Sequence, residues 1–460
     1  MASDGFSSLP ISSTQISNLD SLGYKTMTPV QAQGLPHVLQ GKDLIARAKT
    51  GSGKTATFGI GLLQQINPRF FGAQALVLCP TRELADQVGK ELRKLARSTP
   101  NIKLVLLCGG KPFAPQKASL EHGAHIVVGT PGRIQDHLDR ETLTLAGLKI
   151  LVLDEADRML DMGFFDAITM IIAQTPKIRQ TLLFSATYPD TINQLCHSIL
   201  RNPVTVTVES EHKIGVIKQT FYRIKKHERN NTLLALFEHY RPDTTVVFCH
   251  TKKQCAEVAR FLQEHQIEAL AIHGDLEQRE RDQVLVQFAN HSCSVLVATD
   301  VAARGLDIKA LQAVINFELP HDAEVYIHRI GRTGRAGEKG IAVSLFTDYE
   351  QPRVNAIEAF QKKPCVCDVP ESLNRDPGFT MQSPMVTIQI DAGRKNKLRP
   401  GDLLGALTGD ADLAGSQIGK IDIFDVSSYV AVERSELRQA LDHLASGKVK
   451  GRNVRARKVG

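Results

Sequence analysis

Short runs of apolar, largely β-branched residues alternate with longer amphipathic segments over the first half of the chain. The runs that we expect to form strands lie at residues 43–46, 73–80, 103–110, 125–131, 149–157 and 180–187. Continuous apolar strands that alternate with helices are typical of a parallel sheet covered on both faces. The pattern therefore predicts a first α/β lobe over residues 1–207.

The same alternation returns after residue 218 and predicts a second α/β lobe over residues 218–360. Its expected strands lie at residues 244–251, 268–275, 293–300, 312–319 and 340–346. The periodicity then fails between residues 361 and 384, where four prolines interrupt the chain. Prolines at this density favour an extended connection, so we interpret residues 361–384 as a linker.

A third unit is predicted over residues 385–460. We expect strands at 385–390, 419–424, 428–433 and 453–458, with helices within 399–408 and at 435–445. This βαββαβ order is the ferredoxin-like arrangement that RRM domains use to bind RNA. The predicted fold class is therefore α/β with two tandem parallel-sheet lobes, followed by an RRM-like α+β domain.

Charge changes this picture only at the C-terminal end, because a net charge of +7 is modest for 460 residues. No acidic residue follows Asp442, whereas six basic residues crowd the last thirteen positions: Lys448, Lys450, Arg452, Arg455, Arg457 and Lys458. Such a run forms either a solvated tail or a surface for a polyanion. In an RRM-like domain we favour RNA contacts over the tail.

The eight cysteines are scattered and lack the paired spacing of a zinc or redox site. We therefore expect reduced thiols and no metal-thiolate site. The N-terminal residues lack the basic and apolar regions of a signal peptide, and no stretch approaches the length of a membrane span. We expect a cytoplasmic protein that works without a membrane.

A glycine-rich segment follows the first predicted strand and opens a helix, which is the context of a phosphate-binding loop. Its glycines let successive backbone N–H groups and the helix N-terminus face phosphate oxygens. We expect the side chain of Lys54 to contact phosphates and the hydroxyl of Thr55 to bind Mg²⁺. The residues assigned to ATP here are Thr50, Gly51, Ser52, Gly53, Lys54 and Thr55.

Two carboxylates, Asp154 and Glu155, end the apolar run at 149–153. They would emerge at the carboxyl edge of a parallel sheet, where ligands bind. Asp154 could then hold Mg²⁺, partly through water, while Glu155 orients the attacking water. Acidic residues also favour helix N-termini for structural reasons, but the upstream phosphate loop favours the nucleotide interpretation.

With these two motifs, nine further segments make the chain resemble the DEAD-box RNA helicases. They are MTPVQ (27–31), PTREL (80–84), the glycines at 109–110, TPGR (130–133), SAT (185–187), VFCHT (247–251), QRER (278–281), ATDVAARGLD (298–307) and HRIGRTGR (328–335). The resemblance covers nearly all of the chain and is strongest to the bacterial DbpA type. It implies that both lobes are RecA-like and that the chain is an RNA-stimulated ATPase with ATP and Mg²⁺ as cofactors.

The resemblance also implies roles for individual residues. Gln31 would read the adenine edge, with Phe6 and Tyr24 packed near the base, and Asp307 would contact the ribose. Arg332 and Arg335 would act as arginine fingers on the γ-phosphate, while His328, Ser185 and Thr187 couple the site to lobe closure. The implied RNA-backbone contacts are Arg82, Gly110, Thr130 and Arg133 in the first lobe, and Thr251, Arg281 and Thr299 in the second.

Residues 401–432 resemble the auxiliary domain of the DbpA-type helicases, which implies large-subunit ribosomal RNA and its assembly intermediates as partners. Tyr429 is the only aromatic residue on the third predicted strand, so the basic C-terminal residues are better candidates for RNA contacts. We expect local unwinding of short rRNA duplexes during ribosome assembly, with no obligate protein partner. An ATP-gated clamp that does not separate strands remains an alternative, while a DNA-translocating helicase is disfavoured by the motif set.

Overall fold

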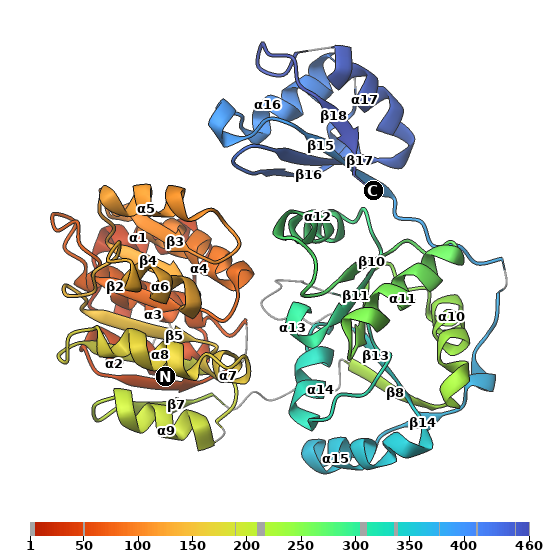
Figure 1. Ribbon diagram of the computed structural model, residues 1–460, viewed down its shortest axis with the longest axis horizontal. Helices are drawn as coiled ribbons and strands as arrows, with labels where there is room; N and C mark the ends of the chain where they lie inside the picture. Colours follow the sequence, from red (N-terminus) through yellow and green to blue (C-terminus); the bar gives the residue numbers. More distant parts are fainter. Residues whose placement is uncertain are drawn as a thin grey trace. The chain divides into compact units, whose positions relative to one another are not determined.

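The computed structural model describes residues 5–48, 51–188, 190–208, 217–303, 311–334, 339–376, 378–410, 413–446 and 448–459. The chain divides into two compact units, with the boundary between residues 211 and 212. The first unit is one lobe. The second contains the other lobe together with the C-terminal domain (Figure 1).

The first lobe is built on a seven-stranded parallel sheet in the order β3-β4-β2-β5-β6-β1-β7. Its strands are β1 (Leu44–Arg47), β2 (Ala75–Leu78), β3 (Leu104–Leu107), β4 (Ile126–Gly129), β5 (Ile150–Asp154), β6 (Gln180–Ser185) and β7 (Val204–Thr207). Its helices are α1 (Ser13–Ser21), α2 (Pro29–Leu39), α3 (Lys54–Gln65), α4 (Arg82–Leu95), α5 (Phe113–Glu121), α6 (Pro131–Asp139), α7 (Ala156–Asp161), α8 (Phe165–Ala173) and α9 (Asp190–Ile199).

Strand β5 shows why the apolar runs of this lobe are continuous. Val152 belongs to the core on one face of the sheet, whereas Leu151 and Leu153 belong to the core on the other face. Successive side chains of a strand point to opposite faces, so a strand with helices on both sides is apolar at every position. The predicted parallel sheet is confirmed.

The second lobe repeats this topology strand for strand, in the order β10-β11-β9-β12-β13-β8-β14. Its strands are β8 (Ile217–Arg223), β9 (Thr245–Cys249), β10 (Ala269–Ile272), β11 (Val295–Thr299), β12 (Ala313–Asn316), β13 (Gly340–Phe346) and β14 (Cys367–Asp368). Its helices are α10 (Arg229–Tyr240), α11 (Lys252–Glu264), α12 (Gln278–Ala289), α13 (Asp300–Ala303), α14 (Ala323–Ile330) and α15 (Gln351–Gln361).

The segment that the sequence suggests as a linker runs along the second lobe. Strand β14 lies inside it and pairs with β8. Leu373 and Met381 are buried in the core of the lobe, and Arg375 forms a 2.6 Å ion pair with Glu238. Few local apolar residues mark this packing, because the partners lie more than a hundred residues away along the chain.

The C-terminal domain is a four-stranded antiparallel sheet in the order β16-β17-β15-β18. Its elements are β15 (Met385–Ile390), α16 (Pro400–Gly405), β16 (Ile418–Ile423), β17 (Ser428–Glu433), α17 (Leu437–Ser446) and β18 (Ala456–Lys458). Ile388, Val430 and Leu444 form its core, on the face covered by the two helices. The predicted βαββαβ order is confirmed.

Candidate nucleotide and RNA sites

The phosphate-binding loop joins β1 to α3, and its backbone conformation depends on glycine. Gly51 and Gly53 have φ values of +83° and +97°. A Cβ on Gly53 would lie 2.5 Å from Nε2 of Gln31, so another residue would be strained and would also collide. Thr50, predicted in this loop, lies outside the described residues, as do Asp307 and Arg335 of the second lobe.

Behind the loop lie polar atoms that have no hydrogen-bond partner among the described residues. They are Nζ of Lys54, Oγ of Ser52 and Oδ1 of Asp154. The Lys54 and Asp154 atoms are 3.8 Å apart, and both side chains are buried. An unsatisfied buried polar group costs about 1–3 kcal/mol, so such groups in a native protein need an explanation. Phosphate oxygens and a divalent cation would satisfy all three, with Thr55 beside them at the start of α3.

The Asp154 carboxyl is poised for a cation. Burial raises its pKa to about 6, and the charges of Glu155 and Asp157 add to this effect, while Lys54 opposes it. A bound divalent cation would favour the ionised carboxylate instead. The donor set therefore fits Mg²⁺ bound to a nucleotide, as the sequence predicts.

Glu155 is held in an unusual backbone conformation next to this carboxyl. Its φ of +53° is left-handed, which non-glycine residues adopt rarely and mostly at functional sites. Its Oε2 lies 3.2 Å from Nη1 of Arg158, and both side chains are buried. The ion pair holds the Glu155 side chain against Arg158 of the helix that follows, next to Asp154. The assigned role of Glu155 in orienting the attacking water stays a prediction.

Asp157 links this strand end to the segment after β6, although its sequence context predicted no role for it. Its Oδ2 accepts hydrogen bonds from the backbone N–H groups of Ala186 and Thr187, at 3.2 and 3.0 Å, and from the Thr187 hydroxyl at 3.0 Å. Its own N–H donates to Oγ of Ser185. The predicted coupling residues are therefore tied directly to the end of β5. In the sequence, the only sign of this contact was that Asp157 lies in the motif at 154–157 and that Ser185 and Thr187 lie in the motif at 185–187.

Gln31 contacts the phosphate loop itself. Its Nε2 donates to the Gly53 carbonyl at 3.2 Å, and its Oε1 accepts from the Thr28 N–H at 2.8 Å. Phe6 and Tyr24 pack edge to face against each other, with ring centroids 6.2 Å apart. The assigned roles of these three side chains in binding adenine remain predictions.

In the second lobe, His328 lies in the last turn of α14 and Arg332 follows that helix with its side chain buried. A third residue of the same motif, Arg329, has a structural position that the sequence did not reveal. It forms two hydrogen bonds to the Asp300 carboxylate, at 2.6 and 2.7 Å, and donates to the Glu318 carbonyl. This buried fork joins α14 to α13.

The predicted RNA contacts of the first lobe all follow strand ends at one edge of the sheet. Arg82 begins α4 after β2, Gly110 follows β3, and Thr130 follows β4. A Cβ at Gly110 would collide with the Arg82 guanidinium, so glycine is needed for their close approach. Arg133 donates to the Lys111 carbonyl at 3.0 Å. The structure brings these four residues to neighbouring positions on the carboxyl edge.

The second lobe has an equivalent row. Thr251 caps α11 by accepting from the Gln254 N–H, and Thr299 ends β11. Arg281 in α12 donates to the Ala302 carbonyl at 2.8 Å. These residues follow β9, β10 and β11, which are the counterparts of β2, β3 and β4.

The sheet of the C-terminal domain packs against the second lobe through the face opposite its own core. Thr387 and Gln389 of β15 contact Ser292 and Gln283 at 2.8 and 3.0 Å. Tyr429 is only 3% exposed, which leaves little surface for stacking a base. Its predicted role in RNA binding stays a prediction, with this burial against it.

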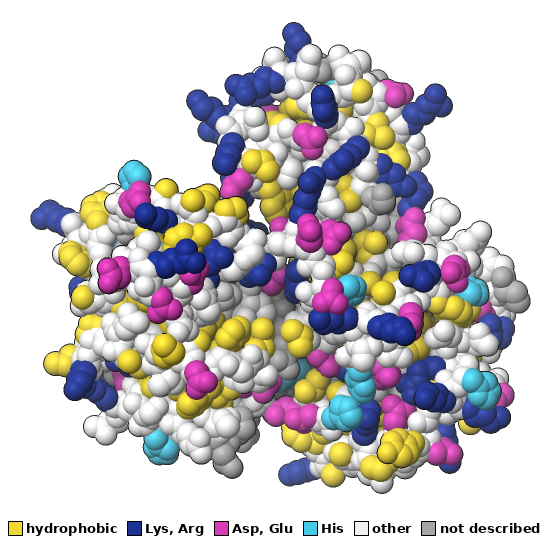
Figure 2. Space-filling model, viewed as in Figure 1, with side chains coloured by type: hydrophobic (Ala, Val, Ile, Leu, Met, Phe, Trp, Pro, Cys, Tyr) yellow, Lys and Arg dark blue, Asp and Glu magenta, His cyan; other side chains and the backbone are white. Residues whose placement is uncertain are grey.

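The basic residues of the domain are, in contrast, exposed, and Lys and Arg side chains gather over it in Figure 2. Lys450 contacts Asp402 at 3.0 Å. Exposed positive charge is what binding of an RNA backbone requires. The exposed set is Lys448, Lys450, Arg452, Arg455, Arg457 and Lys458.

All eight cysteines are free thiols in the structure. Within the described ranges, no group of histidine, cysteine or acidic side chains is arranged to hold a metal ion by itself. Among the described helices, none is both long enough and apolar enough to span a membrane.

Comparison with known protein families gives three matches that together follow the domain order. Residues 28–195 match the DEAD/DEAH box helicase family, residues 228–337 match the helicase conserved C-terminal domain, and residues 387–458 match the DbpA RNA binding domain. The third match coincides with the four-stranded domain described above.

Two curated relatives and one solved structure show how far the similarity extends. The chain is 52% identical to the ATP-dependent RNA helicase DbpA of Escherichia coli K12, over 96% of both chains. It is 42% identical to the DEAD-box ATP-dependent RNA helicase CshA of Bacillus cereus, over 78% of this chain and 68% of the relative. The structure of Saccharomyces cerevisiae Dbp5 bound to RNA and ADP BeF3 is 30% identical, with a TM-score of 0.73, and the alignment covers 80% of this chain and 96% of that one.

Proposed function

The chain belongs to the DEAD-box family of ATP-dependent RNA helicases, and we propose that it locally unwinds short duplexes in large-subunit ribosomal RNA during ribosome assembly. One observation carries the proposal. The nucleotide residues Lys54 and Asp154 emerge at the same sheet edge as the predicted RNA contacts Arg82 and Thr130. Nucleotide and RNA contacts on one rigid sheet allow each ligand to affect binding of the other.

In the proposed cycle, the γ-phosphoryl group of ATP would pass to water. Lys54 and the N-terminus of α3 would hold the phosphates, and Asp154 would hold Mg²⁺, which would supply charge neutralisation there. Glu155 would orient the attacking water. Asp157 would transmit the state of the site to Thr187 through two hydrogen bonds of 3.0 Å, and to Ser185 through one of 3.3 Å.

The C-terminal domain supplies the target preference in this proposal. Strand β15 contacts the second lobe through Thr387 and Gln389, while the basic residues near the C-terminal end of the domain are exposed, so we assign RNA binding to them. Contacts to RNA phosphates by the two lobes carry no direct sequence information. The domain would therefore keep the motor on a chosen RNA element. We place this activity in the cytoplasm, in keeping with eight free thiols.

A strand-displacement assay tests the proposal. The substrate is a short RNA duplex placed beside a large-subunit rRNA hairpin, with the same duplex beside an unrelated hairpin as the control. We expect ATP-dependent displacement that is faster beside the rRNA hairpin, and greater stimulation of ATP hydrolysis by RNA than by DNA. ATP hydrolysis and tight rRNA binding without displacement would instead identify an ATP-gated clamp.

A further inference from the structure

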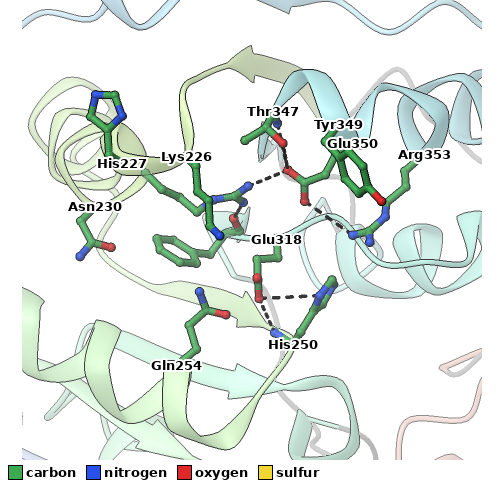
Figure 3. A pocket seen from close by; sticks show the side chains of 12 residues that line it. Lys226, His227, Asn230, His250, Gln254, Glu318, Thr347, Tyr349, Glu350 and Arg353 are labelled. Atoms are coloured by element: carbon green, nitrogen blue, oxygen red, sulfur yellow. Dashed lines mark hydrogen bonds and ion pairs between the residues drawn. The ribbon is translucent and has the colours of Figure 1, made fainter.

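The second lobe contains a cavity of about 570 Å³ at the carboxyl ends of β8, β9, β12 and β13 (Figure 3). β9 and β12 are neighbours in the sheet, but the strand that follows β9 in the chain lies toward one edge of the sheet, and the strand that follows β12 lies toward the other edge. The cavity therefore lies at the topological switch point of the sheet. This is where ligands bind in open α/β folds, and the volume is typical of a small-molecule site. We call it the lobe-two cavity.

The lobe-two cavity is the counterpart of the nucleotide site in the first lobe. The two sheets have the same strand order, so α10 takes the place of α3 and begins at Arg229 as α3 begins at Lys54. Ala313 pairs with Thr245 as Ile150 pairs with Ala75. In this register Glu318 takes the position of Glu155.

Its chemistry nevertheless does not suit a triphosphate. Residues 224–228, which join β8 to α10, contain no glycine. The Arg229 guanidinium is engaged by the Glu350 carboxylate at 2.6 Å and by the Phe317 carbonyl. Two carboxylates, Glu318 and Glu350, line the cavity. Glu350 also lies 3.5 Å from the Arg353 guanidinium, so both arginines of the lining are already paired with a carboxylate. Without a glycine loop the cavity is therefore poorly suited to a triphosphate, which leaves room for a different ligand.

The remaining side chains match the edge and the face of a nucleobase. Asn230, Gln254 and Glu318 all line the cavity, and in Figure 3 Gln254 lies beside Glu318 while Asn230 lies farther away. With its NH₂ group turned toward the carboxylate, Gln254 donates to Oε1 of Glu318 at 3.0 Å. Oε2 of Glu318 accepts from the His250 N–H at 2.8 Å, which fixes the carboxylate in place. A carboxylate accepts hydrogen bonds from amino and imino groups of bases, and guanine presents both side by side.

The rim supplies the other parts that a nucleotide needs. Tyr349 lines the cavity and is 92% exposed, so its ring is available for stacking a base. Lys226, exposed at the same rim, offers positive charge for the adjoining phosphate. Thr251, the predicted backbone contact, directly follows His250 of the cavity wall. A strand held at Thr251 would pass the entrance.

We propose that the lobe-two cavity binds one unstacked base of the RNA strand, with guanine preferred. The motor would then read one nucleotide of sequence in addition to the backbone. This inference rests on the proposed function, because it takes the strand in the second lobe to be RNA. It adds a base contact that the predicted backbone residues do not provide.

The test uses the full chain and a set of single-stranded oligouridines in which one guanosine is moved along the strand. Affinity is measured by fluorescence anisotropy with a non-hydrolysable ATP analogue. We expect one guanosine position to strengthen binding by about tenfold, since a good base contact contributes on the order of 1–3 kcal/mol. Tyr349→Ala and Asn230→Ala should abolish that preference. Phe360→Ala, an exposed aromatic on the nearby helix α15, is the matched control and should retain it.

Three results would overturn the inference. Equal binding of all guanosine positions would mean that no base is read. A preference that persists in Tyr349→Ala and Asn230→Ala would place base reading elsewhere, such as in the C-terminal domain. Competition by free guanosine monophosphate that is lost in the two variants would identify a free nucleotide as the ligand.

ATPase stimulation by oligouridine, measured in parallel, separates this inference from the proposed function. Stimulation together with equal binding at all guanosine positions would refute the cavity alone. Absence of stimulation in the wild-type chain would count against both.

Discussion

Replacing Asp157 by asparagine should loosen the segment that follows β6 without removing any group expected to contact ATP. Oδ2 of Asp157 accepts three hydrogen bonds from Ala186 and Thr187, and Oδ1 accepts one from the Arg158 N–H at 3.0 Å. An asparagine side chain has one oxygen. In either orientation, its NH₂ group therefore faces a donor that was satisfied before.

The magnitude follows from these hydrogen bonds. One buried donor left without a partner costs about 1–3 kcal/mol, and three bonds that lose their charged acceptor weaken by about 1 kcal/mol each. The unpaired donor is the Arg158 N–H, which stays unpaired when the segment opens, so only the three weakened bonds enter the opening equilibrium. The segment should open more easily by about 3 kcal/mol, which is a factor of roughly 150. Strand displacement should fall more than ATP binding, because the weakened bonds lie between the nucleotide site and the coupling residues.

Hydrogen exchange at the Ala186 and Thr187 amides measures this opening directly. Asp139→Asn, an exposed change at the end of α6 in the same lobe, is the control and should leave both amides protected. If the two amides of Asp157→Asn exchanged as slowly as in the wild type, the assigned coupling through Asp157 would be wrong.

Four further predictions concern separate parts of the molecule. Glu155→Gln keeps the shape of the side chain but loses its basicity, so ATP hydrolysis should fall about 100-fold or more while nucleotide binding persists; wild-type turnover in an RNA-stimulated ATPase assay would remove Glu155 from the chemistry. Arg332→Ala should lower the turnover of ATP about 1000-fold, and Arg332→Lys should not restore it, because a single ammonium group cannot replace the two-pronged guanidinium. A wild-type kcat in Arg332→Lys would contradict the role of Arg332 as an arginine finger. Reversing the charge of Lys448, Arg452 and Arg455 should weaken binding to the rRNA hairpin. The slope of the logarithm of the binding constant against the logarithm of the salt concentration should become shallower by about 0.7 for each RNA phosphate that is no longer neutralised. An unchanged slope in anisotropy titrations would mean that these side chains only face solvent. Burial, with Arg133 and Arg140 nearby, lowers the pKa of His137 to about 4. Between about pH 6.5 and 4 the unfolded chain therefore binds a proton that the folded chain does not, so the stability of the fold should decrease as the pH falls through that window. An NMR titration in which His137, assigned with His137→Gln, titrated near its ordinary pKa would contradict this prediction.

The elements and the main chemistry could be predicted from the amino-acid sequence, because both leave local signals. Apolar runs such as 150–153 are continuous wherever a strand is buried on both faces, and the glycines at 51 and 53 are required by left-handed backbone. The positions of Lys54, Asp154 and Glu155 relative to their strands followed from the same signals.

Interactions between residues that are distant in the chain became visible only in the folded molecule. Asp157 accepts hydrogen bonds from residues about thirty positions later in the chain, after β6. Arg329 donates to Asp300 across a similar separation. Gln389 is buried where its sheet meets Gln283 of α12, and no pattern within residues 385–460 encodes that packing.

The lobe-two cavity is the clearest example of a feature that the local sequence does not reveal and that the tertiary structure creates. Asn230, Gln254, Glu318 and Tyr349 come from four separate chain segments, and each is an ordinary polar or exposed residue in its local sequence. They meet only because parallel strands present their carboxyl ends at one edge of the sheet, so strand order rather than local pattern creates the site.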